Sequence, residues 1–241
     1  MSTVFDYSSE IANGIRNLLL GRVLLKEDYT AGDNIVKVGQ EDVYEMPGGY
    51  LFRNRTNEAK LVEPASSNKP GAIDHQENVT ITSTNALHVI IQPATQDYTV
   101  AAGAYLALRT PPIPNIKVIY TDPLGVTIDE IHEKRFPAVA ILRPRVNFRQ
   151  GPSGFVIGNY NFIIRYARLH EAGTDTGAAV LEDTEAIVNL LAEDCHLGGT
   201  VEDSSVVGVS EVRNARVQRG VVVHFVDIHL TAQRSGIYDK F

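Results

Sequence analysis

The sequence predicts an α+β fold, in which helices pack on a small mixed or antiparallel sheet and an all-β domain is inserted into the chain. Apolar residues at helical spacing run from Val180 to Cys195, and two β-branched runs follow, at Val206 to Val212 and at Val221 to Leu230. Helical periodicity is missing between Thr30 and Thr110, where short alternating runs are separated by turn residues. We therefore expect a core domain of residues 1–26 and 115–241 and an inserted β-rich domain of residues 27–114.

Two helices are expected in the core domain. The first runs from Ser8 to Leu25, with Ser8 or Ser9 as its cap and with apolar side chains at helical spacing. The second begins at the cap candidates Thr174, Asp175 and Thr176 and ends at Leu197 and the pair Gly198-Gly199. Its inward face is expected to hold Val180, Ile187, Val188, Leu191 and Cys195.

The remaining elements are expected to be strands. In the inserted domain they lie at residues 34–38, 50–54, 59–63, 78–82, 87–92 and 105–109. In the core domain they lie at residues 116–120, 137–142 and 155–169, and the last of these places Tyr160, Phe162, Ile164 and Tyr166 on one face. Pro111, Pro112 and Pro114 mark a stiff boundary between the domains; a ligand for an aromatic groove is the less favoured interpretation.

Composition excludes some classes of function. The 241 residues include 22 basic and 29 acidic side chains, so the formal net charge of −7 offers no basic field for a nucleic acid backbone. The only cysteine, Cys195, cannot form an intramolecular disulfide, which indicates a reducing compartment. The apolar stretch near the start is broken by Gly21-Arg22 and is far shorter than the ~20 residues of a membrane span, so neither a span nor a signal sequence is expected.

No set of residues predicts catalysis, and we expect no enzyme, no cofactor and no metal site. Gly151-Pro152-Ser153-Gly154-Phe155 is similar to a nucleophile elbow, but it lacks the last glycine and leads into a strand, so a hydrolase using Ser153 or His224 is disfavoured. On a strand, His224 points away from the face that holds Asp227 and His229. The pairs Gly48-Gly49 and Gly198-Gly199 lack the spacing of a phosphate-binding loop.

The pattern that remains favours assembly with copies of the same chain. Two predicted strands, Phe155 to Leu169 and Val221 to Ala232, are longer than the usual ~5 to 6 residues. Long strands in a small domain commonly extend a sheet toward a neighbour. A structural, self-assembling protein is therefore the expected class.

Four segments resemble the tail terminator proteins of long-tailed bacteriophages. They are Arg135-Phe136-Pro137-Ala138-Val139-Ala140-Ile141, the strand end Tyr166-Ala167-Arg168, Leu191 to Val201 with Gly198-Gly199, and Ala232-Gln233-Arg234. The resemblance implies a hexameric ring that caps the tail tube, binds the tail tube protein and joins the tail to a head or neck connector or stopper protein. It implies location in the virion after assembly in the host cytoplasm, with DNA passing through the lumen without specific binding and with no membrane association.

The inserted domain departs from the compact form of that family. A neck stopper or connector protein is therefore the alternative, and the inserted domain is expected to contact sheath, collar or a neighbouring subunit. A further alternative is a partner-binding or glycan-binding module on an α/β scaffold. Within the ring interpretation, two subunit contacts are expected. One is the turn at Gly198-Gly199 with its neighbours, and the other is an arginine cluster that pairs with acidic residues of the next copy such as Asp194 or Glu202; the cluster comprises Arg143, Arg145 and Arg149.

Overall fold

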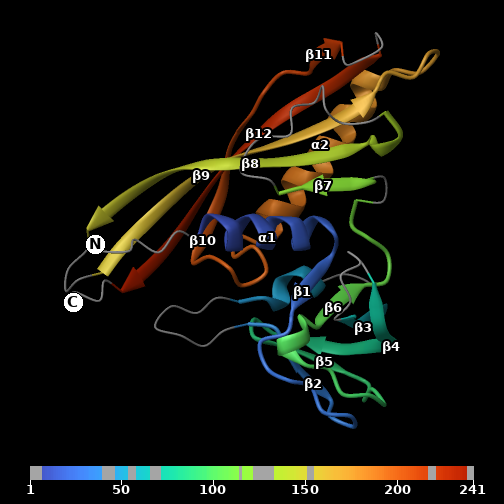
Figure 1. Cartoon of the computed structure of the whole chain (residues 1–241), viewed down its shortest axis with the longest axis vertical. Coiled ribbons are helices and arrows are strands. Elements are labelled where there is room, and N and C mark those ends of the chain that lie inside the picture. The colour runs from blue at the N-terminus through green and yellow to red at the C-terminus, as the bar shows by residue number, and fades with distance from the viewer. Residues whose placement is uncertain are drawn as a thin grey trace. The chain divides into compact units, whose positions relative to one another are not determined.

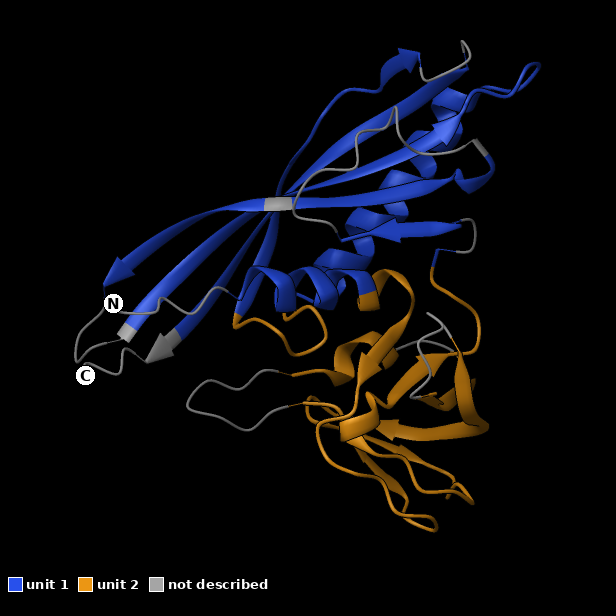
Figure 2. Cartoon of the chain, viewed as in Figure 1, with its two compact units in different colours: residues 1–16, 113–195, 203–241 blue, residues 17–112, 196–202 orange. Residues whose placement is uncertain are grey.

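The computed structural model describes residues 7–39, 47–53, 58–65, 72–113, 116–121, 133–150, 155–216 and 221–237. The chain divides into two compact units, which are coloured separately in Figure 2. Unit 1 comprises Met1–Arg16, Ile113–Cys195 and Asp203–Phe241, and unit 2 comprises Asn17–Pro112 and His196–Glu202. Each unit is built on its own sheet.

The sheet of unit 1 has the strand order β10-β12-β9-β8-β7, and β11 also pairs with β12 (Figure 1). Its neighbouring strands are antiparallel except for β7 and β8, which are parallel. The three central strands are long, so they form a wide ribbon through the unit. The strands are β7 Val118–Tyr120, β8 Ala138–Gln150, β9 Phe155–Leu169, β10 Asp203–Val209, β11 Arg213–Arg216 and β12 Val222–Ile237, and the short 3-10 helix η4 spans Glu133–Arg135.

Helix α2, Thr176–Glu193, packs on one face of this sheet (Figure 1). It begins at Asp175, whose side chain accepts a hydrogen bond from the backbone N–H of Ala178 at 3.0 Å. The predicted inward face of β9 is confirmed, because its four members are each at most 1% exposed: Tyr160, Phe162, Ile164 and Tyr166. Burial of these large side chains, each worth roughly 1.5–3 kcal/mol, is what holds the helix on the sheet.

The opposite face of the same sheet carries a second, smaller apolar cluster. Phe136, Ala138, Ala167 and Val223 are buried there, with half-buried side chains from β7 and β12 around them. Beside the cluster, the guanidinium of Arg165 donates two hydrogen bonds to the Asp227 carboxylate, at 2.5 and 2.8 Å. The carboxylate also contributes to a raised pKa of Arg165, chiefly through these hydrogen bonds.

Unit 2 holds a sheet with the order β1-β6-β3-β4-β5-β2, in which all pairs are antiparallel. The backbone N–H of Lys26, just after β1, donates to the carbonyl of Lys37 in β2 at 2.9 Å, which draws the two ends of the sheet together. The sheet therefore curls toward a closed barrel. Its strands are β1 Arg22–Leu24, β2 Ile35–Lys37, β3 Glu58–Pro64, β4 Ile73–Thr84, β5 His88–Ile91 and β6 Tyr105–Leu108, with the 3-10 helices η1 Gly49–Phe52 and η2 Val100–Ala102.

The α+β fold class expected from the sequence is wrong. Strands account for 47% of the structure and helices for 21%, and the strands form two large curled sheets, so the fold is mainly β. The expectation failed because strand lengths were underestimated: β8 continues to Gln150 and β4 already begins at Ile73. In β4 the residues from Asp74 to Glu77 are polar on both faces and therefore lack the alternation that marks a half-buried strand. In β8 the bulge that contains Pro144 interrupts the strand before its alternating outer residues.

Two local expectations also need correction. Helix α1 spans Ser8–Leu19 and ends well before Leu25, because Gly21 adopts a φ of +68° and the chain turns into β1. The expected strand from Tyr50 is instead η1, since the N–H groups of Gly48 and Gly49 both donate to the carbonyl of Ala86 and hold the chain in a turn. Among the described residues, no helix combines the length and apolar character needed to cross a bilayer.

Candidate functional site

One edge of the unit 1 sheet is formed by the outer half of β8. Strand β7 pairs only with Ala138–Ala140, so within the described residues Ile141–Gln150 has a strand partner on the β9 side alone. A bulge between Leu142 and Arg145 contains Pro144, a residue that sheets tolerate at bulges and edges. The other side of this strand, which no described strand covers, therefore offers N–H and C=O groups to an additional strand.

The side chains of this β8 edge are basic on one face and apolar on the other. Arg145 and Arg149 lie opposite Asn161 and Ile157 of β9, and both arginines are exposed. Phe148 projects to the opposite face and is 47% exposed. Its ring lies edge-on to the Tyr160 ring, with the two ring centroids 6.4 Å apart. Arg143 belongs to β8 as well, but its side chain lies outside the described part of the structure.

The second edge of the same sheet is β10, which among the described strands pairs with β12 alone. Its exposed charge is Asp203, which lies opposite Gln233 of β12. Val209 is 46% exposed and lies opposite Ile228, and a bulge between Val206 and Gly208 leaves Val207 64% exposed. Exposed valines on an edge strand form an apolar surface that is suited to a partner.

The two edges match each other face by face. The odd-numbered residues of β9 and β12 define one sheet face, and Arg145, Arg149 and Asp203 all lie on it. Phe148 and Val209 lie on the other face. A sheet continued from the β8 edge of one copy to the β10 edge of the next would thus place arginine near aspartate and phenylalanine near valine.

Four residues of these edges were not expected from the sequence as site residues: Asp203, Phe148, Val207 and Val209. The β-branched run that contains Val207 and Val209 was a usable signal, because it predicts a strand at this place in the chain. Pro144 was a second signal, since it identifies β8 as an edge.

Asp194 does not belong to this surface. Its side chain is 1% exposed, and its backbone N–H donates to the carbonyl of Leu190 at 3.3 Å at the end of α2. A carboxylate buried in this way cannot meet an arginine of a neighbouring copy, so we remove Asp194 from the expected interface.

The predicted turn residues shape a turn within unit 2. Leu197, Gly198 and Gly199 have φ values of 49°, 68° and 76°, a run of left-handed conformations that favours glycine. The carbonyl of Gly199 accepts a hydrogen bond from the Lys26 ammonium at 3.5 Å, and Glu202 is half-buried at the end of the turn. The backbone conformation accounts for the two glycines, and the role of Gly198, Gly199 and Glu202 in a subunit contact stays a prediction.

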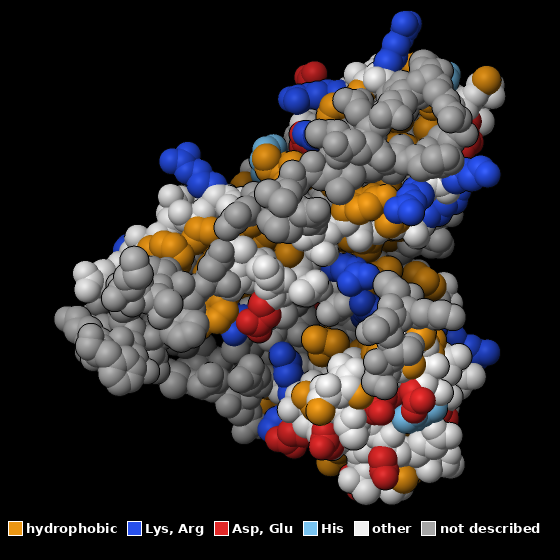
Figure 3. Space-filling view, in the orientation of Figure 1, with side chains coloured by type: hydrophobic (Ala, Val, Ile, Leu, Met, Phe, Trp, Pro, Cys, Tyr) orange, Lys and Arg blue, Asp and Glu red, His pale blue; other side chains and the backbone are white. Residues whose placement is uncertain are grey.

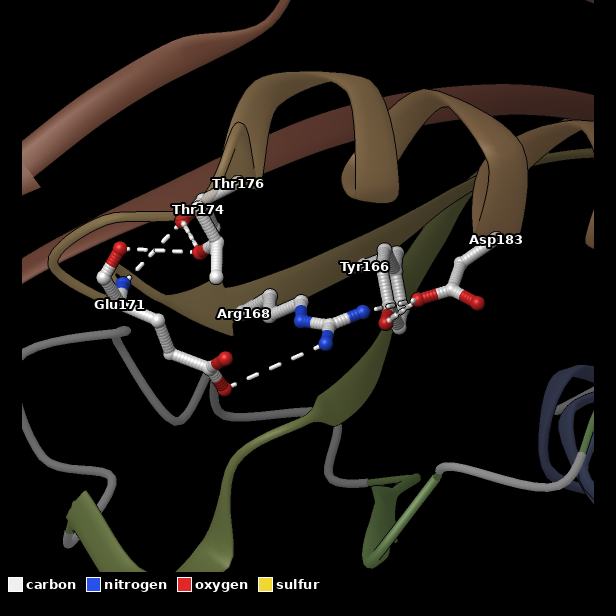
Figure 4. A network of polar contacts seen from close by, with 6 residues as sticks. All are labelled: Tyr166, Arg168, Glu171, Thr174, Thr176 and Asp183. Atoms are coloured by element: carbon white, nitrogen blue, oxygen red, sulfur yellow. Dashed lines mark hydrogen bonds and ion pairs between the residues drawn. The ribbon is translucent and has the colours of Figure 1, made fainter.

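A polar network joins β9 to the start of α2 (Figure 4). The hydroxyl of Tyr166 donates a short hydrogen bond to Asp183, and the guanidinium of Arg168 donates to the same carboxylate oxygen at 3.2 Å. Burial, followed by the hydrogen bond to Asp183, raises the pKa of the Tyr166 hydroxyl. Because Tyr166 is 0% exposed, no substrate reaches this hydroxyl, and the network positions the helix.

The histidines considered as metal ligands on β12 do not converge. Nε2 of His224 lies 3.1 Å from Nδ1 of His170, whereas the Asp227 carboxylate is occupied by Arg165 on the other face. His229 is exposed on that same face. Ser153, the nucleophile of the disfavoured hydrolase hypothesis, lies outside the described residues. Comparison with known proteins adds no assignment, because no family model and no curated protein matches the chain.

Proposed function

We propose that this chain is a virion structural protein that assembles into a hexameric ring, caps the tail tube of a long-tailed bacteriophage and joins the tail to the head or neck. The observation that supports it most directly is the presence of two complementary free edges on one sheet. Unit 1 offers Arg145, Arg149 and Phe148 on the β8 edge and Asp203 and Val209 on the β10 edge.

Complementarity between different edges favours head-to-tail contact. Two β8 edges would bring Arg145 of one copy against Arg149 of the other, so this symmetric pairing carries like-charge repulsion, whereas contact with a β10 edge brings arginine toward Asp203. In a contact between unlike edges, each copy keeps its second edge available for the next copy. Repetition of this contact forms a ring when the rotations between successive copies add up to one full turn. The number of six subunits and the place in the tail come from the resemblance to tail terminator proteins.

The acidic composition is compatible with a channel for DNA. Each copy carries a formal net charge of −7, and a ring wall with this balance repels the DNA backbone so that DNA slides without specific binding. In this proposal the β-rich domain of residues 27–114 contacts collar, sheath or a neighbouring subunit.

The proposal is tested by native mass spectrometry and negative-stain microscopy of the full chain, alone and with tail tubes. We expect rings of six subunits that bind the end of a tube. A chain that remains monomeric both alone and with tubes contradicts the proposal.

The same measurements separate the alternatives. Rings that bind a head connector but no tail tube identify a neck stopper or connector protein. A monomer that captures a carbohydrate on a glycan array identifies a binding module, and the two free edges would then serve no assembly.

A further inference from the structure

A β-bulge in unit 2 brings two adjacent residues to the same point. In the pairing of β3 with β4, Glu63 lies opposite His75 while Pro64 lies opposite Ile73, so Asp74 is the extra residue of the bulge. In a regular strand Asp74 and His75 would point to opposite faces. The bulge instead brings ligand atoms of Glu63, Asp74 and His75 within 4.8 Å of one another.

The imidazole of His75 is held as a metal-binding histidine is usually held. Nε2 lies 2.9 Å from the backbone carbonyl of Asp97, and a hydrogen bond there requires the proton on Nε2. Nδ1 lies 3.0 Å from Oδ2 of Asp74, a separation that suits two ligands of one ion at about 2.0–2.2 Å. A ligating histidine typically donates its other N–H to a carbonyl in this way.

The carboxylate of Glu63 is oriented by a neighbouring turn. Its Oε2 accepts hydrogen bonds from the backbone N–H of Thr99 at 2.6 Å and from the Thr99 hydroxyl at 3.2 Å. A carboxylate has about four acceptor positions, so these two bonds fix its direction and leave capacity for an ion. The carboxylate is therefore positioned from outside the cluster.

A buried hydroxyl beside the cluster provides an independent observation. Tyr98 is 0% exposed and its ring packs against the His75 ring with centroids 4.8 Å apart, yet its hydroxyl has no hydrogen-bond partner among the described residues. The hydroxyl lies in the field of Glu77 and Glu63, which, after burial, help to raise the pKa of Tyr98 to about 12. Leaving such a donor unsatisfied costs roughly 1–3 kcal/mol, so the site fits a further polar group such as an ion with its bound water.

The surroundings favour a cation. Glu63 and Asp74 lie beside His75, Glu77 lies close to Tyr98, and Figure 3 shows a histidine among acidic side chains on the surface of unit 2. We propose that Glu63, Asp74 and His75 bind one divalent transition-metal ion of the Zn²⁺ type. One imidazole nitrogen with two carboxylates is a donor set that suits such an ion.

The ion replaces a proton on His75. Without it, Nδ1 needs a hydrogen to bond to Asp74 while Nε2 donates to Asp97, so the ring is an imidazolium. The hydrogen bond to Asp74 is the main cause of the raised pKa of His75. When the metal binds Nδ1, that proton leaves to solvent, and the ion ties β3, β4 and the loop at Asp97 together.

The test is titration of the full chain with Zn²⁺ by isothermal calorimetry, with all variants made in a His224→Gln background to remove the exposed pair of His170 and His224. We expect one site, and at least a tenfold loss of affinity in His75→Gln, as in Asp74→Asn.

Matched controls lie in the same unit. His88→Gln changes a histidine on β5, and Glu58→Gln changes an exposed glutamate on β3, and both should bind Zn²⁺ like the background protein. The proposal is overturned if the background protein binds no Zn²⁺ at millimolar concentration, or if Asp74→Asn and His75→Gln bind it as tightly as the two controls. Asp74 is exposed, so Asp74→Asn keeps the test decisive even if the histidine variant fails to fold.

Discussion

Charge reversal at the two edges provides the most direct test of head-to-tail assembly. We consider a β8 variant, Arg145→Glu with Arg149→Glu, and a β10 variant, Asp203→Arg. In the first, the glutamates of one copy face Asp203 of the next; in the second, the new arginine on β10 faces the native arginines of β8. Neither variant should assemble alone. A mixture should form rings of alternating copies, because every contact between unlike copies then avoids the repulsion that blocks each variant by itself.

The size of the effect follows from the exposure of these residues. Two unit charges about 4 Å apart interact by about 1 kcal/mol in water, and exposed pairs are measured at the low end of the range. Turning one attraction into a repulsion makes the binding free energy of each contact less favourable by about 2 kcal/mol, which lowers the affinity of the contact roughly 30-fold. A ring requires every contact at once, so the loss is repeated at each one.

The assay is native mass spectrometry at low and high ionic strength, since exposed charge pairs are screened by salt. A matched control reverses two exposed glutamates on α2, Glu182→Arg with Glu185→Arg, and should assemble like the unmodified chain. Assembly of either edge variant alone, or failure of the mixture to assemble while the control does, would refute the head-to-tail contact.

Three further predictions concern stability and use denaturant unfolding of the full chain. Tyr166→Phe removes the donor to the Asp183 carboxylate and should lower the unfolding free energy by about 2 kcal/mol; an unchanged midpoint would show that the network in Figure 4 is not stabilising. Gly21→Ala should lower the free energy of unfolding by about 2 kcal/mol, because the φ of Gly21 is +68° and an added Cβ would lie 2.6 Å from Cδ of Pro112. A variant more stable than the unmodified chain would contradict this prediction. The third prediction concerns pH, with metal removed by a chelator. Because the pKa of His75 is raised in the folded state, its contribution to the free energy of unfolding is complete below the ordinary pKa of 6.5 and is lost as pH rises through the folded-state pKa. His75→Gln should remove this part of the pH dependence, and an identical pH profile for both proteins would refute it.

Part of the fold was predictable because it depends on local pattern. The start of α2 at Asp175 and the inward face of β9 follow from a capping residue and from alternation, and both agree with the structure. The end of α1 was misplaced because the apolar spacing was followed to Leu25, whereas the left-handed φ of Gly21 ends the helix.

The candidate sites were less predictable. Arg145 and Arg149 were predicted as contact residues with Asp194 or Glu202 as partners, but the burial of Asp194 was not predictable, and Asp203 was not considered. The Glu63, Asp74 and His75 cluster was not anticipated at all, because adjacent strand residues are expected on opposite faces and only the bulge overrides that rule.

The sequence by itself determined the capped helix α2, the buried face of β9 and the negative net charge, since these depend on the order of neighbouring residues and on composition. Only the tertiary structure decided which strands lie at the edges, how far β8 and β4 extend, and where bulges bring side chains together. The physical reason is that a strand acquires its partner, its register and its bulges from residues far away in the chain, and these pairings leave little trace in local periodicity.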